Sequence, residues 1–178
     1  GNNNRYVRII GDRSGYWISA LDSEVSPGSI LPGEVIIDGS DIVDENSIIY
    51  LAGCSYFIFE GLTIINGQKL SDLSHGAHGI RMKKEAATSL PCRNIIIKHC
   101  VVHSCAGGVI IMYDSPDSIE VFNCLVYNTG FMDTVNSRGS GGICCYGGTN
   151  ITIENCTSFM HSRRSIQLTG CAFSICLL

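Results

Sequence analysis

One apolar pattern recurs without gaps in four segments of the chain, at residues 56–66, 94–104, 118–128 and 150–160. In each segment a second apolar residue follows the first after two positions, and a leucine or cysteine follows the second after three. A spacing of two is typical of a β-strand with one buried face, because successive side chains of a strand point to opposite faces. The change to a spacing of three predicts a corner between two strands. The chain is therefore expected to be a stack of repeated strand–corner–strand units.

A further strand completes each unit. Short apolar runs follow the repeated segments after a stretch of variable length, at residues 47–51, 79–82, 108–112, 142–146 and 165–168. We therefore predict an all-β parallel solenoid with three strands per coil. The first apolar position of each coil is expected at residues 7, 35, 57, 95, 119, 151 and 173, which makes about six to seven coils in one domain over residues 1–178. No cap is visible at either end of the pattern, so we expect a fragment of a longer solenoid.

Equivalent residues of stacked coils should form columns, because neighbouring parallel strands lie about 4.8 Å apart. The third apolar position predicts an interior column of reduced cysteines, since parallel side chains have poor geometry for disulfides. The preceding corner position is expected to have left-handed backbone, with an asparagine ladder at its last two members. These two columns are Cys100, Cys124 and Cys156, and Gly61, His99, Asn123 and Asn155. The insertions at 67–78, 83–93 and 129–141 should be surface loops, the first and last on the same side.

Composition and charge exclude several classes of protein. The formal net charge is −4 and the Lys and Arg residues are scattered, so nucleic acid is not expected as a partner. The apolar runs are far shorter than the roughly 20 residues that a membrane-spanning helix needs. Residues 1–5 show no signal-peptide pattern. The 10 cysteines do not form the paired CxxC motifs of a zinc site.

Three sequence motifs resemble those of right-handed parallel β-helix repeat proteins related to pectate lyases and other polysaccharide lyases. They are GLTIING at residues 61–67, the NIxIxNCxV-like units that begin at Asn94, Ser118 and Asn150, and PGEVIIDGS at residues 32–40. The resemblance covers about residues 35–168 and implies a right-handed parallel β-helix. It also implies a carbohydrate substrate along the strands at residues 79–82, 108–112, 142–146 and 165–168, and under the loops before them. Activity is implied only weakly, because the fold hosts lyases, hydrolases, epimerases, tailspikes and adhesins.

Strand alternation divides the residues of this candidate binding strand between the interior and the outside. The residues predicted to face inward are Ile80, Met82, Val109, Ile111, Ile143, Cys145, Ile166 and Leu168. Those predicted to face outward are Arg81, Lys83, Ile110, Met112, Cys144, Tyr146, Gln167 and Thr169. The outward apolar residues would suit stacking on sugar rings or contact with another protein.

A lyase that acts on a uronate polymer needs a base and a positive group that stabilises the enolate. Lys or Arg often serves as the base in the families that the chain resembles. We predict Lys83 and Arg81 as catalytic residues, because both should project from one strand face. The predicted substrate-binding residues lie in the neighbouring loops and strand ends: His75, His78, Arg138, Tyr146, Arg163 and Arg164. Surface Lys and Arg are also common as merely solubilising residues.

Metal dependence is left open by the sequence. The resemblance to pectate lyases implies calcium, yet Ca²⁺ prefers six to eight oxygen ligands. Only Asp114 and Asp133 are acids near the predicted groove, and they belong to different loops. His75 and His78 are spaced to share a metal ion, although two histidines in such a loop are more often only exposed polar residues.

Three classes of function remain from the sequence. The first is a polysaccharide lyase, or a related carbohydrate-active protein, that cleaves or binds an acidic polysaccharide. The second is a non-catalytic glycan-binding protein or adhesin, and the third is a structural spacer of a surface protein. The resemblance implies a secreted, periplasmic or cell-surface protein.

Overall fold

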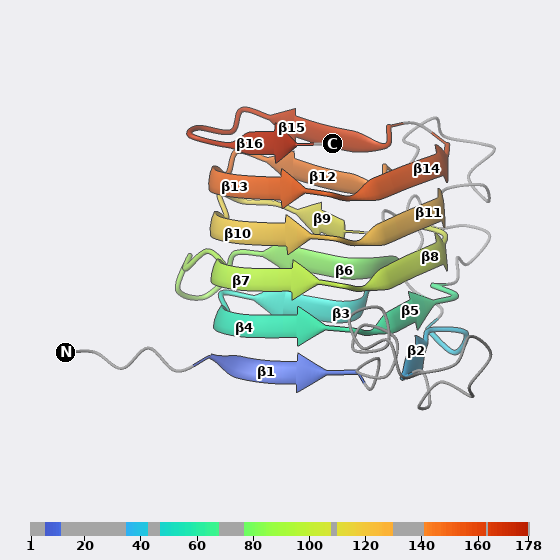
Figure 1. Ribbon diagram of the computed structural model, residues 1–178. Helices are drawn as coiled ribbons and strands as arrows, with labels where there is room; N and C mark the ends of the chain where they lie inside the picture. Colours follow the sequence, from blue (N-terminus) through green and yellow to red (C-terminus); the bar gives the residue numbers. More distant parts are fainter. Residues whose placement is uncertain are drawn as a thin grey trace, which may run out of the picture.

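The computed structural model describes residues 6–11, 35–42, 47–67, 77–107, 110–129, 141–162 and 164–177. The described residues form strands β1 to β16 and contain no helix. The strands stack in three parallel sheets that surround one elongated core (Figure 1). The all-β parallel solenoid that the repeat predicted is therefore confirmed.

Three sheets, here named A, B and C, run the length of the stack. Sheet A contains β1 (Val7–Ile10), β4 (Ser55–Glu60), β7 (Arg93–Lys98), β10 (Asp117–Phe122), β13 (Thr149–Glu154) and β16 (Ile175–Leu177). Sheet B contains β2 (Ile36–Asp38), β5 (Thr63–Ile65), β8 (Val101–Cys105), β11 (Leu125–Thr129) and β14 (Thr157–His161). Sheet C contains β3 (Ser47–Ala52), β6 (His78–Lys83), β9 (Ile110–Met112), β12 (Ile143–Tyr146) and β15 (Ile166–Thr169).

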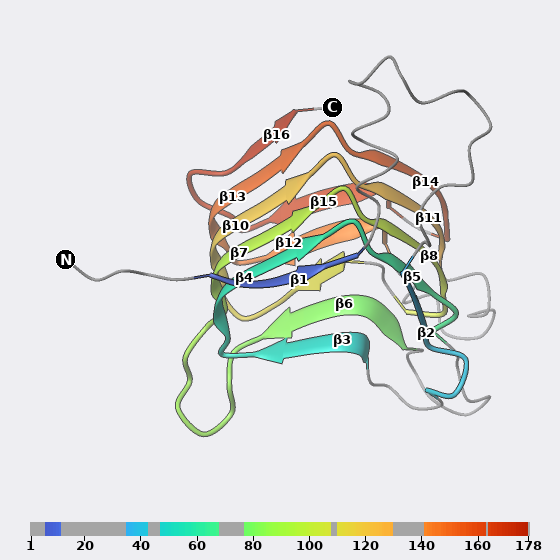
Figure 2. The ribbon, with the colours of Figure 1, turned by 60° about the horizontal axis from the view of Figure 1, so that its bottom comes forward.

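The chain visits the sheets in the order A, B, C, so each coil has three strands as predicted (Figure 2). The described strands make five complete coils and the first strand of a sixth. One prediction about the coils was wrong. Val35 does not begin a coil, because Ile36–Asp38 pairs with Thr63–Ile65 in sheet B and is the second strand of the first coil. A three-residue apolar run carries no alternation that would distinguish one sheet from another.

The core consists of columns of apolar side chains, one residue from each coil. In sheet A, Ile95, Ile119 and Ile151 pair in register and are fully buried. The predicted cysteine column is also confirmed: Cys100, Cys124 and Cys156 are 1%, 2% and 8% exposed, and all three are free thiols. These columns make one continuous core through the solenoid.

Left-handed backbone recurs at the corner between sheets A and B. The φ angles of Gly61, His99, Asn123 and Asn155 are 69°, 55°, 52° and 50°, which confirms the predicted corner. Asn and Gly adopt this conformation more easily than other residues. The Asn123 side chain is hydrogen bonded to the His99 ring, with 3.0 Å between Nδ2 and Nδ1. Between these two coils the corner column is therefore linked by a hydrogen bond between an amide and an imidazole.

The register of β9 differs from the prediction by one residue. Ile110 pairs with Ile80 and with Ile143, and both Ile110 and Met112 are fully buried. The prediction that they face outward was wrong. The run from Val109 to Met112 consists of four apolar residues. Because no polar residue interrupts it, the sequence does not show which of the four side chains face outward.

The surface loop predicted at 83–93 lies between β6 and β7 and projects from the stack in Figure 2. Cys92 near its end is an exception, since this residue is 1% exposed and packs in the core. A short turn closes the loop, in which the Glu85 and Leu90 backbones are hydrogen bonded. Most of the two other predicted loops, at 68–76 and 130–140, lies outside the described residues. Each of these segments joins a sheet B strand to a sheet C strand.

Candidate functional site

Several outward positions of sheet C carry polar side chains, which together we call the sheet C face. Ile111 and the buried Cys144 occupy the two positions between Arg81 and Gln167 in one outward column. Arg81 and Lys83 alternate with the fully buried Ile80 and Met82, so both point outward from β6 and are partly exposed. The outward residues of the next coils follow them along the solenoid. The sheet C face comprises Arg81, Lys83, Tyr113, Tyr146, Gln167 and Thr169.

Two tyrosines form the centre of the sheet C face. The Tyr113 and Tyr146 rings are stacked, with 5.2 Å between their centroids and 9° between their planes. The Arg81 guanidinium carbon lies 5.7 Å from the centroid of the Tyr113 ring. Because the two rings face one another, they present mainly edges and hydroxyls to the outside. This arrangement suits hydrogen bonding to sugar hydroxyls better than the ring stacking that the sequence predicted.

Hydrogen bonds extend the row toward the last coil. The Tyr146 hydroxyl donates to Oε1 of Gln167 at 3.2 Å. The Gln167 amide in turn donates to Oγ1 of Thr169 at 2.5 Å. The polar groups of these two successive coils are therefore held in fixed orientations.

Both phenols are protonated at neutral pH, as a tyrosine ordinarily is, and burial makes them weaker acids still. Burial raises the pKa of Tyr113 above 10.0, although the nearby Arg81 charge opposes the shift. Burial also raises the pKa of Tyr146 to about 12, with further contributions from Cys144 and Tyr113. Each hydroxyl can therefore act as a hydrogen-bond donor.

The structure places the predicted site residues in several locations. Arg81, Lys83 and Tyr146 belong to the sheet C face, whereas His78 begins β6 and is only 4% exposed. This burial removes His78 from the exposed groove in which the sequence placed it. Arg164 is exposed between β14 and β15. His75, Arg138 and Arg163 lie outside the described residues.

Sequence reasoning missed Tyr113 as a site residue. The error in the β9 register placed Met112 outside and so hid the equivalence of Tyr113 and Tyr146. The two tyrosines occupy the same position of consecutive coils, since Cys145 pairs with Met112. A signal was present: in both coils a tyrosine directly follows the last buried residue of the sheet C strand.

No cluster of three or more His, Cys, Asp or Glu side chains among the described residues could hold a metal ion. The described part of the chain also contains no helix long and apolar enough to cross a membrane.

Comparison with known proteins identifies the repeat. The family model for the right-handed β-helix region matches residues 13–157. Comparisons with curated proteins and with solved structures gave no match. The match spans most of the chain and agrees with the parallel three-sheet stack. The chain therefore belongs to the right-handed β-helix family.

Proposed function

We propose that the sheet C face binds an acidic polysaccharide that lies along the axis of the solenoid. One observation carries the proposal: a cation pair, two protonated phenols, an amide and a hydroxyl follow one another on the same outer face. A polymer of uronate sugars offers carboxylates to the cations and hydroxyls to the neutral groups. Charge-assisted hydrogen bonds from Arg to carboxylate are among the strongest available in such a site.

The spacing of the groups supports a repetitive ligand. Neighbouring strands of a parallel sheet lie about 4.8 Å apart, and the two tyrosine centroids are 5.2 Å apart. A polymer that follows the axis would therefore meet an equivalent outer position at each coil. A small ligand would contact only part of this row.

Cleavage by β-elimination would use the cation pair. In this proposal Lys83 accepts the proton beside the uronate carboxylate, while Arg81 stabilises the negative charge of the enolate. The electrons of the broken C–H bond form a carbon–carbon double bond, and the glycosidic C–O bond breaks. The leaving oxygen takes a proton, for which the protonated Tyr113 hydroxyl is available in the adjacent coil.

Binding is tested with oligosaccharides of pectate, alginate and chondroitin at low salt, by calorimetry. We expect Arg81→Ala to weaken binding at least tenfold, because a charge-assisted hydrogen bond contributes about 1.5–3 kcal/mol. The matched control is Arg93→Ala, which removes an exposed arginine from sheet A and should leave the affinity unchanged. Equal binding by Arg81→Ala and the native chain would overturn the proposal.

Turnover is tested separately, through the absorbance of the unsaturated product. Lys83→Ala should lower the rate by 10²–10⁴-fold, the usual contribution of a general base, and leave coil stability nearly unchanged. Lys84→Ala, the exposed neighbour, is the control. Binding without product would favour the second function class, a non-catalytic glycan binder or adhesin.

A further inference from the structure

The sign of the charge on the sheet C face changes from coil to coil. The second coil, which ends with β6, carries Arg81 and Lys83 on its outer side. Lys84 and Glu85 follow in the loop with opposite charges. The net charge at this coil is therefore positive.

The third coil, which ends with β9, carries a negative charge instead. Ile111 stands in register with Arg81, and Tyr113 occupies the position of Lys83. Asp114 comes directly after Tyr113 and is exposed. It forms no ion pair with any residue in the described ranges. A ligand at this coil would therefore meet an unbalanced carboxylate.

The turn that follows each sheet C strand does not require this carboxylate. Asp114, Gly147 and Gly170 occupy the same corner of three consecutive coils, with φ angles of 61°, 73° and 63°. Glycine forms such a left-handed turn most easily. A Cβ atom at Gly147 would meet only Ser115 Oγ, at 3.8 Å, so side chains have room at this corner. The charge of Asp114 is therefore a property of the outer face and not of the packing.

Both signs of charge reach the phenol at the centre of the face. Burial is the main cause of the raised pKa of Tyr113. The Arg81 charge lowers this pKa and the Asp114 charge raises it. A sugar bound at the Tyr113 hydroxyl would therefore lie within range of the cation of one coil and the anion of the next.

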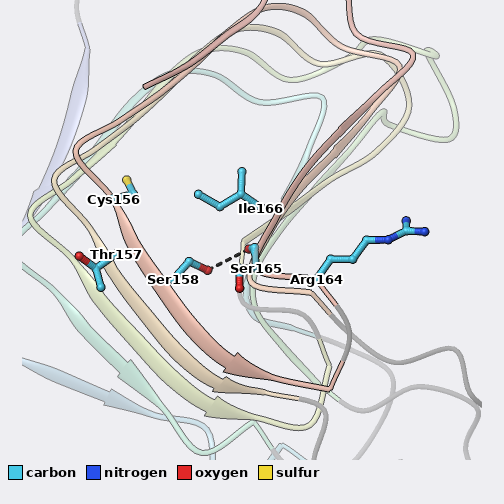
Figure 3. Close-up of a pocket in the computed structure, with 6 residues that line it drawn as sticks. All are labelled: Cys156, Thr157, Ser158, Arg164, Ser165 and Ile166. Carbon is cyan, nitrogen blue, oxygen red and sulfur yellow. Dashed lines mark hydrogen bonds between the residues drawn. The ribbon is translucent and has the colours of Figure 1, made fainter. Parts of the chain in front are cut away.

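A positive charge returns at the fourth coil, which ends with β12. Arg164 is exposed between β14 and β15, and its side chain extends away from Ile166, which packs against the core (Figure 3). Burial raises the pKa values of Tyr146 and Cys144, and the Arg164 charge opposes both shifts. Both residues belong to β12, so the Arg164 charge acts on the outer side of this coil.

We propose that the sheet C face selects a polysaccharide in which acidic and neutral sugars alternate, with Asp114 as the residue that excludes an acidic sugar from the third coil. The inference rests on the proposed binding of an acidic polysaccharide and names its class. One sugar is assigned to each coil, because neighbouring coils lie about 4.8 Å apart, close to the length of one sugar unit. Acidic sugars then lie at the second and fourth coils, beside Arg81 with Lys83 and beside Arg164.

Asp114 discriminates by attraction as well as by repulsion. Its carboxylate can accept hydrogen bonds from the hydroxyls of a neutral sugar. A polymer with a carboxylate on every sugar would place one of them near Asp114, where like charges repel. Such a repulsive element is a usual source of specificity between similar ligands.

The test uses the complete 178-residue chain and two oligosaccharides with equal numbers of sugars, compared by calorimetry at low salt. Unsulfated chondroitin alternates glucuronate with a neutral amino sugar, whereas polygalacturonate has a carboxylate on every sugar. The native chain should bind the chondroitin oligosaccharide more tightly. Asp114→Asn keeps a residue that tolerates left-handed backbone. It should strengthen binding of the galacturonate oligosaccharide by about threefold or more, because repulsion between nearby charges is strong at low ionic strength, and should change chondroitin binding much less.

Two control variants make the same changes of charge on sheet A. Glu120→Gln removes an exposed carboxylate from β10 and should leave both affinities unchanged. Arg164→Gln should weaken chondroitin binding, whereas Arg93→Gln, at an exposed position of β7, should not. Effects of Glu120→Gln equal to those of Asp114→Asn would show that only the net charge matters and would overturn the inference.

Carboxyl-reduced chondroitin separates the two ways in which the inference can fail. If it binds as tightly as chondroitin itself, carboxylates are not recognised, and the proposed function fails together with this inference. If carboxylates are recognised and Arg81→Ala weakens binding of both oligosaccharides, the proposed function stands. In that case an unchanged ratio of the two affinities in Asp114→Asn would overturn the selection of an alternating polymer alone.

Discussion

The residue at each corner of a coil determines the free-energy cost of the left-handed backbone there. At the start of the sheet A strands, Asn94, Ser118 and Asn150 all have positive φ, at 52°, 56° and 53°. Tyr56 and Phe173 have positive φ as well. Left-handed backbone costs most L-residues roughly 1–2 kcal/mol, whereas Asn tolerates it better. A residue other than Asn in this column should therefore make the folded chain less stable than Asn would at the same position.

Ser118→Asn should increase the free energy of unfolding by about 0.5 kcal/mol, since it places the residue of the adjacent coils at the same φ. The measurement is chemical denaturation followed by circular dichroism. Thr152→Asn is the control, because Thr152 lies in the β-strand conformation of sheet A, where Asn is unfavourable. A loss of stability on Ser118→Asn would contradict the explanation.

Two histidines should make the stability depend on pH. Burial lowers the pKa of His161 and of His99 below 6.5, and the Lys98 charge adds to the effect at His99. The unfolded chain therefore binds more protons than the folded chain between the folded pKa values and 6.5. Stability is complete above pH 6.5 and decreases as the pH falls through that window.

We expect the denaturation midpoint to decrease between pH 7 and pH 5, and His99→Asn to flatten this dependence. Asn is the residue of the same corner in the next two coils, Asn123 and Asn155, so the variant should fold. A midpoint that rises on acidification would show that the two rings are not buried as neutral groups.

At the scale of elements, each strand contributes side chains to columns, and burial raises the pKa of several of the interior thiols. Cys156 differs, because its hydrogen bond with Cys124 lowers its pKa to about 7. All ten cysteines are free, and seven of them are buried. Burial raises the pKa of Cys105 to about 11 and that of Cys145 still further. Thiolate is the reactive form of cysteine, so these thiols should be inert in the folded chain.

A thiol reagent such as dithionitrobenzoate should therefore distinguish the cysteines by position. The exposed Cys176 should react first and the partly exposed Cys54 and Cys171 next. Full reaction should require unfolding. Rapid reaction of all ten thiols without denaturant would mean that the interior column is not packed as described.

At the scale of the molecule, coils contact only their neighbours, so the stability of the stack is close to a sum over coils and the interfaces between them. Inner coils are covered on both sides, and their side chains are fully buried, as at Ile119. At β16 the side chains are open, with Ile175 54% exposed. An isoleucine in an inner coil should therefore contribute more to the free energy of unfolding than an isoleucine in the terminal strand.

Ile119→Ala should lower the free energy of unfolding by about 2–5 kcal/mol, because it leaves a cavity in a close-packed column. Ile175→Ala should change it by less than about 0.5 kcal/mol. Both are measured by chemical denaturation under the same conditions. Similar losses from the two variants would show that the terminal strand contributes to the core as fully as an inner one.

The sequence by itself determined the coil. The alternating apolar pairs, the change of spacing at Cys100, Cys124 and Cys156, and the Gly and Asn residues at the corner depend on local backbone geometry and on burial of one face. Such features repeat in every coil and need no knowledge of distant contacts. They were sufficient for the strands, the interior thiols and the left-handed corners.

Only the tertiary structure decided the register of β9 and the composition of the site. The run from Val109 to Met112 has no polar residue, and its register depends on pairing with β6 and β12, far away in sequence. The contact of Tyr113 with Tyr146 and that of His161 with Thr129 depend on the same stacking of coils. Loops of unequal length separate these residues, so their sequence spacing does not reveal that they meet.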